Sequence, residues 1–318
     1  NKWWLSKKKG KSTFISPQII SDPTLSCGKK VKFKVVQDAG GPTEGTVGRT
    51  GAICVSCGSN ASLSYIRVEG QAGRIGKQLM AIAADGERKR IYFEADELQI
   101  SAADVQRPDL VPDGEISKHP QYMGVPRYGM TTFGDLFTSR QATTLTNFVK
   151  LIDPLRNKVQ ADAAELGIPS GVSFESGGID SIAYSDAIAT YLAMTISRLA
   201  DLSNSLCGWE PLAECPRHLF ARQAIPMAWD FAEGNPLGDS SGSWRVLLRG
   251  TARSFASVAF NRADTAAGEV AKNNAATRSY EDFVVSTDPP YYDYVPYSDL
   301  SDFFYSWLRP SLNSIFPT

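Results

Sequence analysis

Asp288, Pro289, Pro290 and Tyr291 follow one another, and their residue types suit the binding of an exocyclic amino group. Such an amine is a poor nucleophile because its lone pair is delocalised into the aromatic ring. The Asp288 carboxylate can accept one N–H bond and the Pro289 carbonyl another, which draws the nitrogen toward a nucleophilic geometry. The prolines fix φ and hold that carbonyl in place. Tyr291 offers a face on which a flipped base can stack.

The residues on either side predict the elements that position this motif. The apolar, β-branched stretch 283–287 predicts a buried strand, and a helix capped by Ser298 and ended by Pro310 is expected after the motif. A strand, a polar loop and a helix together place ligands at the carboxyl edge of an open α/β sheet. The alternative is a proline-rich loop without chemistry. The expected apolar stripe of the helix comprises Leu300, Phe303, Phe304, Trp307 and Leu308.

The motif and its flanks are similar to those of a known family. Residues 285–293 and 297–305 resemble the prokaryotic adenine-specific DNA methylases that carry a zinc ribbon. An aspartate at the first motif position is more common in adenine enzymes than in those that methylate cytosine N4. Further stretches that resemble the same family are residues 3–11, 44–49, 136–141 and 229–233.

This resemblance implies a fold, a reaction and a partner. The implied fold is α/β, part of a Rossmann-like methyltransferase fold with a β-rich, zinc-ribbon-like N-terminal region and a helical middle region. The implied reaction is S-adenosylmethionine-dependent methyl transfer to adenine N6 of a flipped base in DNA. The implied catalytic residues are Asp288, Pro289, Pro290 and Tyr291.

Composition limits the class of protein. A chain of 318 residues with 42% hydrophobic and 21% charged residues is typical of a globular protein with room for two domains. No apolar run is long enough to span a membrane, and no signal-peptide pattern opens the chain. We therefore expect a cytoplasmic protein without a membrane partner. The chain opens on Asn1 and ends soon after the motif, so we expect it to be a segment of a longer protein.

The net charge is −1, but the charges are unevenly distributed. Residues 1–36 hold nine lysines and one acid, whereas residues 281–318 hold six acids and one arginine. A basic segment beside two tryptophans indicates phosphate contact and base stacking. The alternative is a solvated, flexible terminus. The candidate nucleic-acid-binding residues are Trp3, Trp4, Lys7, Lys8 and Lys9.

The five cysteines favour reduced thiols, because their count is odd and no secretory signal is present. Cys54 and Cys57, with two residues between them and Gly58 after them, have the spacing of half a tetrahedral zinc site. In the resembling family a further cysteine pair lies before the Trp-Trp segment. Two interpretations stay open: a zinc site completed by other residues, or ordinary thiols.

Three parts are expected along the chain. Residues 1–115 form a basic, mostly β region with the cysteine pair, residues 116–240 a helical region, and residues 241–318 the α/β methyltransferase segment with the motif. Expected strands include 31–36, 62–68, 79–84 and 90–94, and expected helices include 143–164, divided or kinked by Pro154, 180–204 and 244–259. Gly70, Gly73 and Gly76 beside Lys77 resemble a phosphate cradle, but a glycine-rich hairpin connection is the preferred interpretation.

The donor-binding half of a methyltransferase is incomplete in this sequence. Phe137 and Thr138 weakly resemble a segment that touches the methyl donor, although a Thr138 helix cap without a ligand explains them equally well. No glycine-rich donor loop follows a strand, and residues 174–178 come nearest to one.

Two classes of function are therefore open. The first is an adenine-N6 DNA methyltransferase, or an RNA amino-methyltransferase as its variant. The second is a nucleic-acid-binding specificity module that is inactive without a donor-binding partner. For either class we expect DNA as a partner, together with other protein subunits of a modification or defence system.

Overall fold

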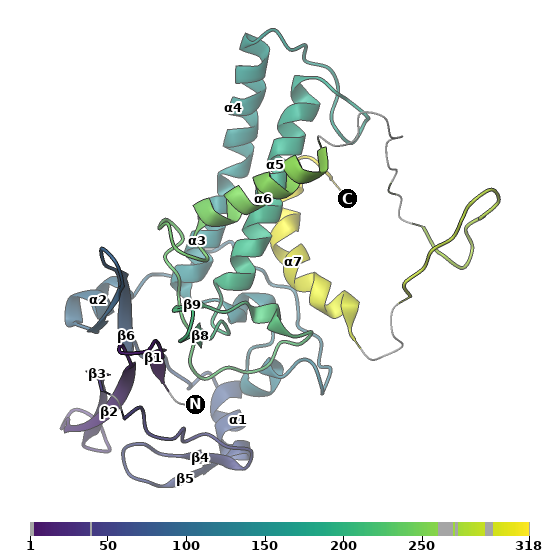
Figure 1. Cartoon of the computed structure of the whole chain (residues 1–318). Coiled ribbons are helices and arrows are strands. Elements are labelled where there is room, and N and C mark those ends of the chain that lie inside the picture. The colour runs from purple at the N-terminus through teal and green to yellow at the C-terminus, as the bar shows by residue number, and fades with distance from the viewer. Residues whose placement is uncertain (1–2, 39, 260–269, 271–272, 290–294, 318) are drawn as a thin grey trace.

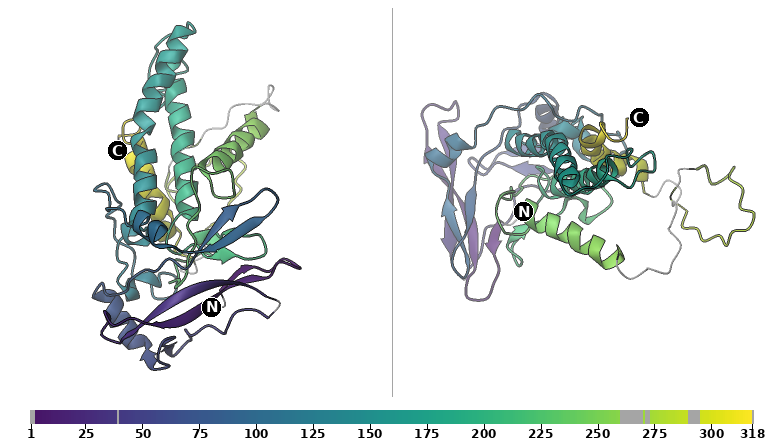
Figure 2. Two further views of the ribbon diagram at one scale, coloured as in Figure 1. Left: turned by 90° about the vertical axis from the view of Figure 1, so that its left-hand side faces the viewer. Right: turned by 90° about the horizontal axis from the view of Figure 1, so that it is seen from above.

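The computed structural model describes residues 3–38, 40–259, 270, 273–289 and 295–317. Figure 1 shows a group of helices next to several small sheets, with residues 273–289 lying to the side of both. The right-hand view in Figure 2 shows the same separation. None of the helices in the described residues combines the length and the apolar character that a membrane crossing needs.

The N-terminal region contains a three-stranded antiparallel sheet of β1 (Trp4–Ser6), β2 (Thr13–Ser21) and β3 (Lys29–Gln37). The predicted strand at residues 31–36 is confirmed. Successive residues of β3 alternate between half-buried Val31, Phe33 and Val35 and exposed lysines, as the period of a strand requires. A hairpin of β6 (Ala81–Asp85) and β7 (Arg90–Glu94) confirms two further predicted strands.

The strand predicted at residues 62–68 is wrong. A short hairpin of β4 (Gly51–Ile53) and β5 (Asn60–Ser62) leads directly into helix α1 (Leu63–Gln71). The Ser62 hydroxyl caps this helix by accepting the N–H of Tyr65 at 3.2 Å. Leu63, Ile66 and Gly70 face inward with helical spacing, so the apolar residues of this stretch follow the helical period of 3.6 residues rather than the strand period of 2.

The glycine-rich hairpin connection predicted around Gly70 is also wrong, because Gly70 lies within α1. A Cβ on Gly70 would lie 2.5 Å from the Tyr128 carbonyl oxygen. Opposite it, Gly129 has a φ of +89° and follows the 3₁₀ helix η1 (Val125–Tyr128). Two glycines therefore allow the N-terminal region and the helical region to touch backbone to backbone. Helix α2 (Glu97–Ala102) completes the N-terminal region.

The helical region confirms most of its predicted elements. Pro154 stands in the first turn of a new helix, so the predicted stretch 143–164 is divided between two helices at Leu151. The helices are η2 (Phe133–Leu136), α3 (Ser139–Lys150), α4 (Ile152–Glu165), α5 (Ser181–Leu202), η3 (Leu219–Ala221), α6 (Trp244–Ala259) and α7 (Tyr297–Leu312). A small two-stranded sheet joins β8 (Trp209–Glu210) to β9 (Cys215–Pro216).

The hydrophobic core joins α3, α5 and α7. Phe303 and Trp307 of α7 are 0% and 1% exposed, and both rings contact Phe137. The predicted stripe of α7 therefore faces the core. The helix begins at Tyr297, before Ser298, and it continues through Pro310 to Leu312. The core cluster includes residues of both the predicted 116–240 and 241–318 parts.

The strand predicted at residues 283–287 is not formed. The described residues 283–289 belong to no helix or strand, and Val284 is fully exposed. A β-strand needs a neighbour for its N–H and C=O groups, and none of the four small sheets offers one here. Those sheets pair their strands antiparallel, so the Rossmann-like methyltransferase fold, which needs a parallel sheet, stays a prediction.

Candidate functional site

The motif divides between described and undescribed residues. Asp288 and Pro289 lie at the end of the exposed segment 273–289, while Pro290 and Tyr291 lie outside the described residues. Within the segment, the Arg278 guanidinium lies 5.2 Å from the centre of the Phe283 ring. The side chains before the motif are thus apolar and open to solvent, and the predicted geometry of the amine site stays untested.

A large groove lies between the N-terminal sheets and the helical region. Its volume is about 1260 Å³. Three of the stretches that resemble the DNA methylase family line this groove, although the first and last are more than two hundred residues apart in sequence. Residues of these stretches in the groove wall are Trp3, Trp4, Leu5, Lys7, Thr138, Ser139, Arg140, Trp229, Asp230, Phe231, Ala232 and Glu233.

The stretch 3–11 is fixed to the groove by its backbone. The Leu5 carbonyl accepts hydrogen bonds from Trp209 Nε1 at 2.7 Å and from the Tyr92 hydroxyl at 3.1 Å. The Lys7 N–H donates to the Pro211 carbonyl at 3.0 Å. These bonds tie the first strand to β7 and to β8, so the N-terminal tryptophans have defined positions.

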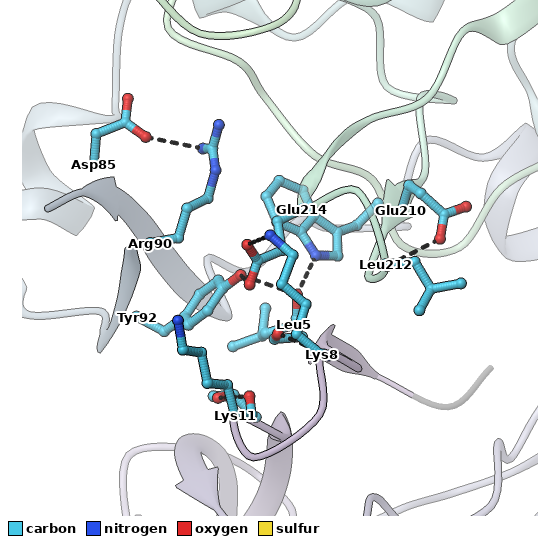
Figure 3. Close-up of polar contacts among 12 residues, drawn as sticks. Leu5, Lys8, Lys11, Asp85, Arg90, Tyr92, Glu210, Leu212 and Glu214 are labelled. Carbon is cyan, nitrogen blue, oxygen red and sulfur yellow. Dashed lines mark hydrogen bonds and ion pairs between the residues drawn. The ribbon is translucent and has the colours of Figure 1, made fainter. Parts of the chain in front are cut away.

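Glu214 holds the same stretch through its side chain, as Figure 3 shows. Lys8 Nζ forms an ion pair with its carboxylate, and the Tyr92 hydroxyl donates to it at 3.1 Å. Burial raises the pKa of Glu214, but hydrogen bonds from Lys8, Ser6 and Tyr92 outweigh burial and hold that pKa below its usual value. Burial, followed by the charge of Glu214, raises the pKa of Tyr92.

The five predicted nucleic-acid-binding residues have different environments. Trp3 packs edge-on against Phe33 at 5.5 Å, and Trp4 packs against Phe14 at 5.8 Å. Lys7 Nζ lies 5.5 Å from the centre of the Trp4 ring, so Trp3, Trp4 and Lys7 belong to the groove. Lys8 is paired with Glu214 as described above. Lys9 is exposed.

Phe137 and Thr138 have structural roles that the sequence also allowed. Phe137 is 1% exposed and packs against α7. The Thr138 hydroxyl accepts the Gln141 N–H at 3.2 Å, and Gln141 Oε1 accepts the Thr138 N–H at 2.9 Å, which completes a capping box at the start of α3. The N-cap interpretation is confirmed, and contact with a methyl donor stays a prediction.

Ion pairs line the groove, and sequence reasoning did not find them. Arg140 binds Glu233 through two hydrogen bonds of 2.6 and 2.9 Å. Arg217 pairs with Glu210, and Arg90 lies 3.6 Å from Asp85. Arg140 and Glu233 are 93 residues apart, so no local spacing in the sequence predicts their pairing. The groove therefore combines tryptophan rings with paired and unpaired cations.

Cys54 and Cys57 lie in the exposed turn between β4 and β5. The Gly58 N–H donates to the Cys54 carbonyl at 2.8 Å, and Gly58 has a φ of +74° that suits glycine. Hydrogen bonding with Ser59, and then with Cys54, lowers the pKa of the Cys57 thiol. In the described part of the chain no third histidine, cysteine or carboxylate joins them in a possible metal site. These residues alone supply half of a tetrahedral zinc site.

Comparisons of this chain with family models, with curated proteins and with solved structures found no match.

Proposed function

We propose that this chain is the target-binding part of an S-adenosylmethionine-dependent DNA methyltransferase that acts on adenine N6. The observation that carries the proposal is the sequence Asp288-Pro289-Pro290-Tyr291 after the β-branched stretch 283–287. In this proposal the Asp288 carboxylate and the Pro289 carbonyl each accept one N–H of the amine. The stretch 283–287 becomes a strand when a neighbouring strand is available.

The groove supports the same proposal. Three stretches that resemble the family by sequence line one groove in space, which is expected of residues that share a ligand. Trp3, Trp4 and Trp229 offer faces for bases, and Lys7 and Lys77 offer charges for phosphates. A target strand that lies in such a groove presents one extruded base to the motif.

The described residues fit the target amine better than they fit the methyl donor. The donor, when bound, supplies an electrophilic methyl group. Phe137 is buried against α7, and residues 174–178 form a turn between α4 and α5 rather than a loop after a strand. Asp186 holds this turn by accepting the Phe174 N–H at 3.0 Å. We therefore assign no donor-binding step to these residues.

A second candidate function is a nucleic-acid-binding specificity module that needs a donor-binding partner. The exposed stretch 283–287 favours it, because Phe283, Val284 and Val285 are 60%, 102% and 52% exposed. An apolar, β-branched run of this kind is typical of a strand buried on both faces. In this second candidate, a sheet from another part of the protein or from a partner subunit buries the stretch 283–287 and pairs with its backbone.

The replacement Asp288→Ala in the full-length protein tests the proposed function. Loss of one group that stabilises the reacting amine lowers methyl transfer by about a hundredfold or more. DNA binding stays unchanged, because the groove is intact. Glu281→Ala removes an exposed acid from the same segment and serves as the matched control. Equal transfer rates in Asp288→Ala and Glu281→Ala contradict the proposal.

A further inference from the structure

Lys77 lines the groove, and no described carboxylate forms an ion pair with it. It stands in the connection between α1 and β6, next to Gly76, and both residues line the groove. Its side chain is exposed there. With the other described residues Lys77 forms no hydrogen bond or ion pair, whereas Arg90, Arg140 and Arg217 each have an acid beside them.

Two arginines add their charges to that of Lys77. Arg107 donates to the carbonyls of Phe137 and Gly134 at 3.1 and 2.6 Å, so these bonds are to neutral acceptors and leave its charge uncompensated by them. Arg140 also reaches the Ala103 carbonyl at 2.5 Å, in addition to its pair with Glu233. Lys77 and Arg140 therefore line the groove together, and the charges of Arg107 and Glu233 also act on Lys77.

The environment of Lys77 reflects this excess of positive charge. Partial desolvation lowers the pKa of the Lys77 ammonium, and repulsion by Arg107 and Arg140 lowers it further, while Glu233 opposes the change. The charged form of Lys77 is thus disfavoured in the free protein. A bound anion removes this penalty, because it pairs with the ammonium and offsets both guanidinium charges.

We propose that Lys77 and Arg140, supported by the nearby charge of Arg107, form a binding site for a phosphate group of a single-stranded nucleic acid that lies along the groove. The start of α3 adds to this site, since Thr138, Ser139 and Arg140 line the groove and the N-terminal turn of a twelve-residue helix favours negative charge. The identification of the ligand as nucleic acid rests on the proposed function. The prediction that an oxyanion binds here depends only on the positive charges of Lys77, Arg107 and Arg140.

The remainder of the groove identifies the source of the phosphate. A volume of about 1260 Å³ exceeds what an isolated phosphate needs. Trp3, Trp4, Trp209 and Trp229 line the same groove, and aromatic rings along a basic channel are the usual means of holding unpaired bases. Free phosphate explains the cations but not the tryptophans. An anionic membrane surface does not fit a concave site.

The test uses the full-length protein and a fluorescently labelled single-stranded oligodeoxynucleotide. Lys77→Met keeps the aliphatic stem and removes the charge, so affinity falls about tenfold and the slope of log K against log salt flattens by about 0.7. Lys77→Arg restores both values. Lys158→Met, which removes an exposed lysine paired with Asp162 on α4, behaves like the parent protein. Circular dichroism verifies that each variant is folded.

Three results overturn the proposal. The first is an unchanged affinity and salt slope in folded Lys77→Met. The second is binding of inorganic phosphate by a protein that does not bind the oligodeoxynucleotide. The third is binding to vesicles with anionic lipid but not to the oligodeoxynucleotide. A failure of the proposed function gives a different result. In that case Asp288→Ala retains methyl transfer, while Lys77→Met still binds the nucleic acid more weakly.

Discussion

Helix α7 and the segment before the motif differ in packing, although only a few residues separate them. Phe303 and Trp307 of α7 are 0% and 1% exposed, whereas Val284 is 102% exposed. Both stretches are apolar in sequence. The described residues therefore complete the environment of the helix but not that of the predicted strand. Helix burial needs only one packed face, whereas strand burial needs hydrogen-bonded neighbours as well.

The helical core and the motif segment thus differ in how far the described residues complete their surroundings. Within the described residues, the helical core packs its apolar side chains together and the stretch 3–11 is anchored through its backbone. The motif segment and the cysteine pair are exposed. We infer that the exposed parts complete their environment by contact with other residues, whereas the apolar side chains of the core are already packed.

The largest expected contrast is in cysteine reactivity. Burial raises the pKa of Cys207 to about 12, whereas Cys57 is exposed and its pKa is lowered. Since only the thiolate reacts, iodoacetamide at pH 8 should modify Cys57 on the order of a thousandfold faster than Cys207. Mass spectrometry of timed samples measures the ratio. Similar rates would contradict the difference in exposure and pKa between Cys57 and Cys207. Protection of Cys57 that a chelator removes would indicate bound zinc.

Trp307→Ala should be strongly destabilising. The indole is buried against Phe137, so its removal leaves a cavity that costs about 3–5 kcal/mol of unfolding free energy. Urea denaturation followed by circular dichroism measures this cost. Leu98→Ala on exposed α2 is the control, with an expected change below about 0.5 kcal/mol. A small effect of Trp307→Ala would show that α7 is not part of the core.

Glu214→Gln should have an intermediate effect that depends on pH. The variant loses the ion pair with Lys8 and is destabilised by about 1–3 kcal/mol at pH 7. Because the folded-state pKa of Glu214 is lowered, its stabilisation is present above its ordinary pKa and is lost as pH falls through the lowered value. Thermal unfolding of parent and variant should therefore converge in acid. A pH-independent difference would argue against the charge of Glu214 as the cause.

Val284→Asp should have the smallest effect on stability. The side chain is fully exposed, so the unfolding free energy of the core changes by less than about 0.5 kcal/mol. Methyl transfer by the full-length protein should nevertheless fall, because a charge in a strand between two sheet neighbours is costly. Unchanged transfer would count against strand formation by residues 283–287 and would weaken the proposed function.

The sequence predicts an element correctly where its apolar residues follow a single period, either the helical period of 3.6 residues or the alternation of a strand. The 3.6 period of α5 and α7, the alternation in β3 and the bounds of α6 and β7 follow from the order of apolar residues. Residues 62–68 were misassigned because their alternating apolar positions hid the Ser62 cap and the inward spacing of Leu63, Ile66 and Gly70. The close approach of Gly70 and Gly129 was beyond any local pattern.

The candidate site was predictable only in its separate pieces. Trp3, Trp4 and Lys7 were identified from composition, and the motif from its residue types. Their neighbours Trp209, Glu214 and Arg140 come from distant parts of the chain, so only the tertiary fold brings them together. The sequence places Lys77 beside three glycines, but only the tertiary fold brings it within the influence of Arg107 and Arg140.

The most direct test of target-amine binding by the motif is mass spectrometry of nucleosides from DNA of cells that produce the full-length protein. The account predicts N6-methyladenine with the parent protein and its loss with Asp288→Ala, at equal protein levels. Methylation of cytosine N4 instead, or equal N6-methyladenine in parent and variant, would contradict it.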